Sequence, residues 1–229
     1  NWQKIESPTD KTLHSVSFKD FKNGIAVGEF GTVILYKDGR WTNQQNVTKG
    51  DLFTAVYKND YIWIAGGIEC VNIPIMKLTN KDGLNIECST ESFSIIKRIC
   101  FSSEKDGWAV GSPSVLMHYD GSKWEKTQPD FKFPSLNSVY FINEKNGIFV
   151  GYEGILMIYS DGKLITETSD KNYKLNDVFI TSNSYYAVGD RGTIITKRWN
   201  AKNGGKIFVD NFEEVNIYPN PCNEILTVL

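Results

Sequence analysis

The sequence has little of what several common functional sites require. Its 229 residues include only two histidines and four arginines, and no apolar run reaches the roughly 18 residues of a membrane-spanning helix. Because arginine supplies bidentate contacts to carboxylates and phosphates, such recognition is scarce here. The two histidines, His14 and His118, stand far apart in the chain and leave little for a zinc site or a histidine-based triad. We therefore expect no metal, no cofactor and no membrane span.

An excess of positive charge is missing too. The chain carries 25 Lys and Arg residues against 27 Asp and Glu residues, for a net charge of −2. A protein that binds by neutralising phosphates needs a basic balance, so we expect no nucleic-acid partner. Residues 1–4 lack the basic flank and apolar stretch of a signal peptide, so either the chain is cytoplasmic or a leader has been removed.

What the sequence does contain is one pattern that occurs five times. Each copy has an apolar strand, a second strand that ends in small residues and glycine, and a third apolar strand, usually closed by Asp-Gly. The shared glycine recurs every 38 to 45 residues, at Gly28, Gly66, Gly111, Gly151 and Gly189. A period near 40 residues without helical spacing is the signature of four-stranded propeller blades, whereas a stacked β-solenoid usually has a shorter repeat.

The outer strands of the blades suggest how the ring closes. Candidates follow the Asp-Gly turns at residues 40–42, 84–87, 123–126 and 163–166, but the fifth repeat lacks one. Residues 2–5 read like residues 124–127 and precede the first repeat. We therefore predict an all-β fold: a five-bladed β-propeller over residues 1–199, closed by the N-terminal strand completing the last blade, plus a short C-terminal β segment.

The repeats look like those of a known family. Residues 24–41 (GIAVGEFGTVILYKDGRW) and 107–124 (GWAVGSPSVLMHYDGSKW) resemble the photosystem II stability/assembly factor-like repeats, which belong with the BNR/Asp-box propellers. The family's Asp box is reduced here to forms such as Tyr-Lys-Asp-Gly. The resemblance implies a propeller and does not imply photosynthesis, because one fold serves many functions.

A second resemblance lies at the end of the chain. Residues 212–229 look like the start of a type IX secretion C-terminal sorting domain, which opens with the box Tyr218, Pro219, Asn220 and Pro221. The resemblance implies a protein of a Bacteroidota-type bacterium that is secreted or held at the outer-membrane surface, with the secretion machinery as a partner. Residues 200–211 then form a linker. An ordinary terminal strand after a proline turn is the alternative.

Aspartates and cysteines have structural interpretations that compete with functional ones. The Asp-Gly pairs fit tight hairpin turns better than a calcium site, because each lies on a different blade. Of the four cysteines, Cys70 and Cys88 flank one hairpin but stand five positions out of register, so a disulfide would need an irregular strand. Cys100 fits a buried filler position, and Cys222 lies in the sorting segment.

The candidate binding surface is one face of the ring. Loops between the second and third strands share this face with the residues that lead into the first strands, such as His14, Asn137 and residues 97–98 and 176–177. These positions vary between repeats while the strand pattern persists, as on a binding surface or on unconstrained loops. The predicted ligand-binding residues are Glu29, Phe30, Arg98, Tyr152, Glu153, Asp177, Asp190 and Arg191.

Acidic and aromatic groups on this face suit a glycan or a basic protein patch. We therefore expect a binding module for a protein or glycan rather than an enzyme. A glycoside hydrolase that uses two carboxylates from Glu29, Glu153, Asp177 and Asp190 is one alternative, and a non-catalytic assembly or scaffold factor is the other. A sialidase is disfavoured because only Arg98 and Arg191 could hold the substrate carboxylate.

Overall fold

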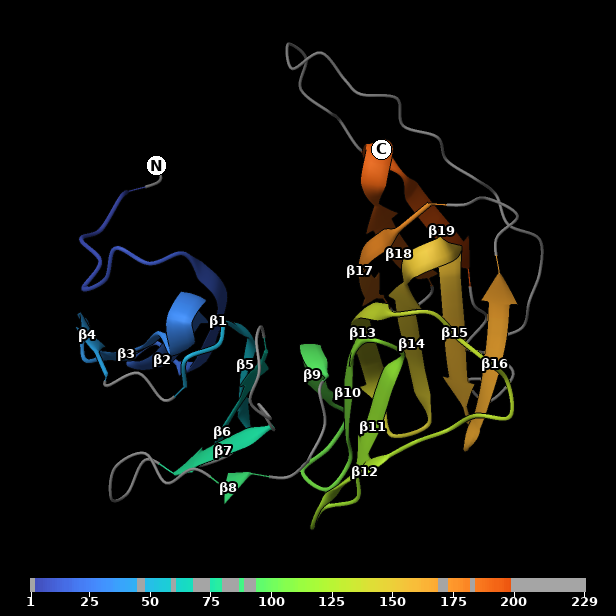
Figure 1. Cartoon of the computed structure of the whole chain (residues 1–229), viewed down its shortest axis with the longest axis horizontal. Coiled ribbons are helices and arrows are strands. Elements are labelled where there is room, and N and C mark those ends of the chain that lie inside the picture. Colours follow the sequence, from blue (N-terminus) through green and yellow to red (C-terminus); the bar gives the residue numbers. More distant parts are fainter. Residues whose placement is uncertain are drawn as a thin grey trace.

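The computed structural model describes residues 3–44, 48–58, 61–67, 75–79, 87–88, 94–168, 173–181 and 184–198. These residues form five antiparallel sheets that follow one another along an arc (Figure 1). The strands of sheets 1 to 5 are, in turn, β1 (Leu13–Asp20), β2 (Asn23–Gly28), β3 (Val33–Lys37) and β4 (Arg40–Asn43); β5 (Leu52–Lys58), β6 (Tyr61–Gly66), β7 (Met76–Thr79) and β8 (Glu87–Cys88); β9 (Ile95–Phe101), β10 (Gly107–Ser112), β11 (Val115–Tyr119) and β12 (Trp124–Lys126); β13 (Leu136–Asn143), β14 (Asn146–Gly151), β15 (Ile155–Ser160) and β16 (Lys163–Thr168); β17 (Leu175–Ile180), β18 (Ser184–Gly189) and β19 (Ile194–Arg198).

Each repeat of the sequence therefore forms one sheet, whose strands are hydrogen-bonded in chain order. The inner strands β1, β5, β9, β13 and β17 contact one another in that order. This arrangement confirms the predicted all-β propeller fold. Within the described residues, no helix is long and apolar enough to cross a membrane.

The tight-turn interpretation of the Asp-Gly pairs is confirmed at Asp38 and Asp161, whereas residues 120–123 form a longer connection in which only Gly121 has a positive φ, of 96°. Asp38 and Gly39 have φ of 45° and 93°, and Asp161 and Gly162 have φ of 47° and 84°. Two consecutive left-handed residues are the requirement of the tight turn that matches the twist of a hairpin. These aspartates therefore shape turns between the third and outer strands of sheets 1 and 4.

A steric contact within each sheet explains the five recurring glycines. A Cβ on Gly28 would meet the carbonyl oxygen of Thr12, and a Cβ on Gly151 would meet that of Ser135. The same close approach occurs at Gly66, Gly111 and Gly189. In every sheet the chain at the start of the inner strand thus crosses directly over the end of the second strand, so only glycine fits there.

Neighbouring sheets pack through faces of opposite kind. We call the face that packs on the following sheet the forward face and the opposite one the backward face. Ile25 on the forward face of sheet 1 packs with Ile64 of sheet 2, and Trp63 on the forward face of sheet 2 packs with Ile99 of sheet 3. The same alternation joins sheets 3, 4 and 5. The core therefore lies between the sheets.

Aromatic side chains on the backward faces form a recurring cluster, which we call the aromatic socket. In sheet 3 it consists of Phe101, Tyr119 and Trp124, whose rings lie 5.3 to 5.9 Å apart. Trp63 of sheet 2 enters this socket, at 5.2 Å from Tyr119 and 5.6 Å from Phe101. Such pairs add stability beyond the apolar area that they bury.

Closure by the N-terminal strand is not observed, and this part of the prediction needs correction. Residues 3–12 form no strand, sheet 5 has only three strands, and sheets 1 and 5 stand at opposite ends of the arc (Figure 1). Ile5 instead lies beside Leu13 and Trp41 of sheet 1. Placing Ile5 beside a sheet that begins only eight residues later orders less chain than bridging to β19 would. Trp2 lies outside the described residues.

Several other predicted features also fall outside the described residues. They are the linker at residues 200–211, the sorting segment at 212–229 with its short β segment, and Cys70 and Cys222. Cys100 lies partly buried at the interface of sheets 3 and 4 with its thiol unbridged. Burial raises the pKa of the Cys100 thiol, which fits the predicted filler role.

Candidate functional site

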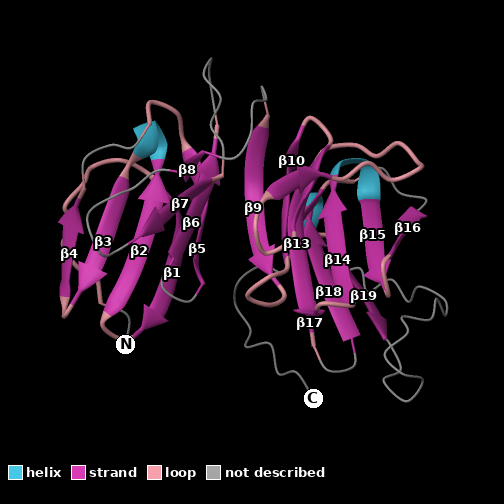
Figure 2. Cartoon of the chain, turned by 90° about the horizontal axis from the view of Figure 1, so that it is seen from below, coloured by secondary structure: helices cyan, strands magenta, loops and turns pink. Residues whose placement is uncertain are grey.

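Three one-turn 3₁₀ helices place most of the predicted binding residues on one rim of the arc. η1 (Glu29–Gly31), η2 (Tyr152–Gly154) and η3 (Asp190–Gly192) follow the second strands of sheets 1, 4 and 5. The first N–H of each turn donates to the carbonyl just before the inner strand, as from Glu29 to Thr12 at 3.0 Å and from Tyr152 to Ser135 at 2.9 Å. The turns and these leading residues therefore share one rim (Figure 2), which we call the loop face.

The central residue of each turn has an unusual backbone conformation. Phe30, Glu153 and Arg191 have φ of 53°, 56° and 58° although none is glycine. Such a conformation is uncommon for a residue with a Cβ, and it is retained only where the surroundings impose it. Here the flanking hydrogen bonds impose it, so the three side chains are presented on the loop face by a rigid frame rather than by a loose loop.

The most developed group of side chains on the loop face is a lysine–tyrosine cluster formed by Lys97, Asn137, Tyr152 and Lys174. The Lys97 Nζ lies 4.7 Å from the centre of the Tyr152 ring, and the Lys174 Nζ lies 5.3 Å from it. Lys97 also donates to Asn137 Oδ1 at 2.7 Å. Because Lys97 comes from β9, Tyr152 from η2 and Lys174 from the residue before β17, the cluster joins three sheets.

Electrostatics make this cluster receptive to negative charge. Partial burial and the nearby Lys174 ammonium, in that order, lower the pKa of Lys97. Two cations that share one aromatic ring repel each other, and the ring quadrupole offsets this repulsion in part. A carboxylate placed between the ammonium groups would relieve the remaining repulsion.

Asn137 holds the cluster in place through hydrogen bonds at both ends of its side chain. Its amide Nδ2 donates to the carbonyl of Leu175 at 2.7 Å, while its Oδ1 accepts from Lys97. Both polar ends of this side chain are therefore engaged, one with sheet 3 and one with sheet 5. The position of the Lys97 ammonium is set by a residue whose own orientation is determined, as a preorganised site requires.

The opposite end of the loop face, at sheets 1 and 2, carries acidic groups instead. Glu29 Oε2 accepts from the Thr12 N–H at 3.3 Å, and Asp51 Oδ1 accepts from the Phe30 N–H at 2.9 Å. The Lys11 ammonium lies 5.9 Å from the ring centre of the exposed Phe30. The loop face therefore carries both signs of charge: Glu29 and Asp51 lie at sheets 1 and 2, while Glu153 of η2 and Asp190 of η3 share sheets 4 and 5 with Lys174.

The predicted carboxylates of sheet 5 have structural partners. Asp177 Oδ1 accepts from Ser138 Oγ at 2.5 Å and from the Val178 N–H at 3.0 Å. Asp190 Oδ1 accepts from Asn176 Nδ2 at 2.8 Å. Asp177 therefore ties sheet 5 to sheet 4, and Asp190 fixes η3 to the inner strand of its own sheet.

The structure brings the predicted site residues together only in part. Tyr152 joins the lysine–tyrosine cluster, while Glu29 and Phe30 lie at the acidic end and Arg98 is exposed on β9. The four carboxylates considered for glycoside hydrolysis are distributed over the sheets: Glu29 in sheet 1, Glu153 in sheet 4, and Asp177 and Asp190 in sheet 5. Among the described residues, no three His, Cys, Asp or Glu side chains gather as metal ligands would.

Sequence reasoning missed Lys174 and treated Lys97 and Asn137 only as residues leading into inner strands. Lys174 occupies the position that Thr12 holds in sheet 1 and Ser135 in sheet 4, directly before an inner strand. The sequence signal that could have indicated this contact is a lysine at this position in one repeat and an aromatic residue, Tyr152, at the start of the turn in the repeat before it. The contact crosses from one sheet to the next, so it becomes visible only when the order of sheets is known.

Comparisons with known proteins establish the fold. No family model matches the chain, and no curated protein matches it. Among solved structures, YCF48 bound to D1 peptide is 14% identical with a TM-score of 0.65, over 85% of this chain and 66% of that chain. YCF48 from Cyanidioschyzon merolae is 14% identical with a TM-score of 0.68, over 94% and 75%. The WD40 β-propeller domain of Doa1 is 15% identical with a TM-score of 0.66, over 82% and 66%.

These similarities confirm the predicted resemblance at the level of the propeller fold. The chain spans about two thirds of the length of the first of these structures. At 14–15% identity the shared property is the arrangement of sheets, since one fold hosts many functions. This chain is thus similar in fold to YCF48 and to a WD40 propeller.

Proposed function

We propose that this protein is a binding module that recognises another protein through the loop face. The observation that carries the proposal is the lysine–tyrosine cluster, in which Lys97 and Lys174 approach the same exposed ring of Tyr152. A partner that places an Asp or Glu side chain, or a terminal carboxylate, at this cluster would neutralise both ammonium groups and gain charge-assisted hydrogen bonds. Tyr152 would provide apolar contact area beside them.

The mixed charge of the loop face supports a protein partner in particular. Glu29 and Asp51 lie at one end of this face, and the two lysines lie at the other end together with Glu153 and Asp190. A folded or extended polypeptide with its own charge pattern can match both ends and gains orientation from doing so. YCF48, similar in fold, occurs in a structure with a bound D1 peptide, which is consistent with peptide recognition on this kind of scaffold.

We also propose that the protein is exported, and the C-terminal motif alone supports this part of the proposal. The box from Tyr218 to Pro221 resembles the start of a type IX sorting domain. On this basis the protein is exported by type IX secretion, with the secretion machinery as a partner, and acts as a secreted or surface-held module. Replacing Tyr218 and Pro219 by alanine in the producing bacterium should leave the protein in the periplasm, as fractionation would show; unchanged export would refute this part.

A peptide-binding assay tests the recognition proposal. We would immobilise matched peptide sets that are acidic, neutral or basic, together with a glycan array, and probe both with the full chain. Acidic peptides should be retained, and the double variant Lys97→Met/Lys174→Met should weaken their binding by about tenfold or more. Lys163→Met, an exposed lysine at the start of β16, is the matched control and should change nothing.

Two outcomes would contradict the proposal. Equal binding by the double variant and the chain itself would remove the cluster from recognition. Binding to glycans but to no peptide would assign the loop face to carbohydrate, the other ligand class that the sequence suggested.

A further inference from the structure

The interior sheets show what an occupied face looks like. Trp108, on the forward face of sheet 3, enters the aromatic socket of sheet 4, where its ring stacks on Phe141 at 5.6 Å and lies 5.1 Å from Tyr159. Trp63 occupies the socket of sheet 3 in the same way. In both cases one large side chain from the second strand of a sheet fills the socket of the next sheet. Phe141 is only 6% exposed as a result.

Sheet 1 has the same aromatic socket, but no preceding sheet fills it. Phe18, Tyr36 and Trp41 form the socket, with ring centres 5.2 to 5.8 Å apart. Phe18 is 48% exposed, against 6% for its counterpart Phe141. Val16, beside the socket on β1, is 61% exposed, whereas its counterpart Val139 in sheet 4 is 1% exposed.

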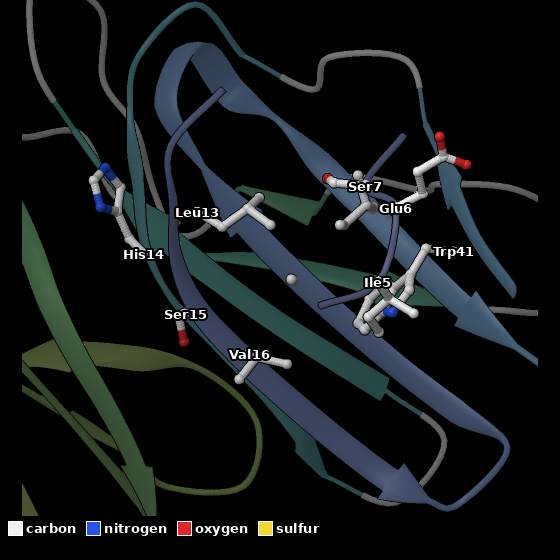
Figure 3. A pocket seen from close by; sticks show the side chains of 10 residues that line it. Ile5, Glu6, Ser7, Leu13, His14, Ser15, Val16 and Trp41 are labelled. Carbon is white, nitrogen blue, oxygen red and sulfur yellow. The ribbon is translucent and has the colours of Figure 1, made fainter. Parts of the chain in front are cut away.

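The N-terminal segment covers this backward face only in part. Residues 5–7 lie over it and leave a cavity of about 380 Å³, which Leu13, Val16 and Trp41 also line (Figure 3). Ile5 itself remains 66% exposed. Because both Ile5 and the aromatic socket remain exposed, this segment does not replace the packing that a neighbouring sheet provides.

Sheet 5 has the complementary feature at the other end of the arc. Tyr186 lies on the second strand of sheet 5, three residues before Gly189. Trp108 holds the same position in sheet 3, three residues before Gly111. Tyr186 is 44% exposed where Trp108 is 3% exposed. Phe179 and Val188 are exposed on the same forward face, which therefore presents the side chains that enter a socket elsewhere.

Hydrogen bonds between inner strands also run in one direction: a side-chain hydroxyl of one sheet accepts from a backbone N–H of the next sheet. Ser15 Oγ accepts from the Ala55 N–H of the next sheet at 3.1 Å, and Thr54 Oγ1 accepts from the Ile99 N–H at 3.3 Å. Asp177 holds the corresponding position in sheet 5, because it pairs with Val188 as Ser15 pairs with Val27. Its Oδ1 accepts instead from Ser138 Oγ of sheet 4 and from the Val178 N–H, so this carboxylate faces the preceding sheet.

We infer that further four-stranded sheets of this same repeat dock on the backward face of sheet 1 and the forward face of sheet 5 and complete the arc. The four interfaces within the chain already show the geometry of this contact, and the two exposed faces are its two complementary halves. The solved propellers that this chain matches have a quarter to a third of their length outside the match. At one sheet per 38 to 45 residues, this difference allows about two more sheets.

A duplication experiment tests the inference with the whole chain. Residues 94–173, the repeats of sheets 3 and 4, are placed ahead of Asn1 so that two sheets precede sheet 1. The added sheet 4 can then fill the socket of sheet 1, and the added sheet 3 can receive Tyr186. The Tm should rise by about 5 °C or more, and the binding of a dye specific for exposed apolar surface should fall at least twofold.

Two substitutions provide the matched control. Val16→Lys and Tyr186→Lys change exposed positions, so in the original chain each should shift the Tm by less than about 2 °C. In the duplicated protein the same substitutions place a lysine within a packed interface and should abolish the gain. An effect that appears only after duplication separates docking from damage to the original sheets.

Two results would overturn the inference. An unchanged Tm and unchanged dye binding after duplication would show that no sheet docks on these faces. Concentration-dependent oligomers of the original chain, dispersed by Val16→Lys and Tyr186→Lys in sedimentation experiments, would assign the faces to a second copy instead. Neither measurement depends on ligand binding at the loop face.

Discussion

The middle of the arc and its two ends are built from one repeat but bury different amounts of it. Between sheets 3 and 4, Trp108 and Phe141 are enclosed, whereas their counterparts Tyr186 in sheet 5 and Phe18 in sheet 1 are exposed. The first three strands nevertheless pair in the same order in all five sheets. The repeat therefore encodes a sheet with two apolar faces, and the neighbouring sheet determines how much stabilisation each face contributes.

This difference implies that stability is unevenly distributed along the chain. In a linear array each unit is stabilised by its own contacts and by those with its nearest neighbours, so units at the ends have only one such interface. Sheets 1 and 5 should therefore open at lower free energy than sheets 3 and 4. Of the recognition residues, Lys97 and Tyr152 belong to interior sheets held from both sides, whereas Lys174 leads into β17 of sheet 5.

The largest expected effect compares a buried aromatic residue in the middle with an exposed one at the end. Trp108→Ala should lower the free energy of unfolding by about 3–5 kcal/mol, because it empties the socket of sheet 4. Tyr186→Ala should cost less than about 1 kcal/mol. Urea denaturation measures both. Trp108→Phe, which keeps a ring in the socket, is the control and should cost much less than Trp108→Ala. Equal losses for Trp108→Ala and Tyr186→Ala would show that the arc does not end at sheet 5.

A buried ion pair links sheet 5 to the rest of the arc. Lys197 Nζ on β19 donates to both carboxylate oxygens of Glu167 on β16 at 2.9 Å, and both residues are buried. Lys197→Met would leave the Glu167 carboxylate buried without its partner and should cost about 3–5 kcal/mol. The double variant Lys197→Met/Glu167→Leu should recover most of this loss. Failure of the double variant to recover would mean that Lys197 acts mainly through packing.

A smaller effect should be independent of position in the arc. Gly28→Ala in sheet 1 and Gly151→Ala in sheet 4 both force a Cβ against a backbone carbonyl of the same sheet. Each should cost about 1–3 kcal/mol, as overpacking does. Gly162→Ala places its Cβ in open space at a φ of 84°, so it measures the cost of backbone strain without a steric contact. A much smaller loss at Gly28 than at Gly151 would show that sheet 1 relaxes where sheet 4 cannot.

The sequence predicted what depends on contacts within one repeat. The sheets, the hairpin turns at Asp38 and Asp161 and the shared loop face all follow from local spacing, turn chemistry and glycine positions. Ring closure was predicted from a resemblance between residues 2–5 and residues 124–127, and the structure does not show it. The competing apolar contact of Ile5 with sheet 1 could not be weighed from the sequence, because it depends on the shape of an unfilled face.

The candidate site shows the same limit. Tyr152 was predicted because it begins a turn on the loop face, but the two lysines beside it come from the sheets before and after its own. A contact between repeats depends on how far each sheet is rotated from the last, which the spacing of residues does not specify. Acidic residues such as Asp177 and Asp190 stood out in the sequence, and the structure engages both in hydrogen bonds that stabilise the frame.

The smallest expected effect concerns pH and a turn in the middle of the arc. Asp120 accepts hydrogen bonds from the Ser122 hydroxyl and from the N–H groups of Ser122 and Lys123, and these lower its pKa from 3.8 to about 2. A carboxyl whose pKa is lowered by folding stabilises the fold at pH values above its unfolded pKa. This contribution is lost as the pH falls from about 4 to about 2. Ser122→Ala removes the largest cause, so an NMR titration should show the pKa of Asp120 returning toward 3.8. An unchanged titration in this variant would mean that the backbone N–H groups alone hold the charge, and the turn would then be set by its backbone, as at Asp38.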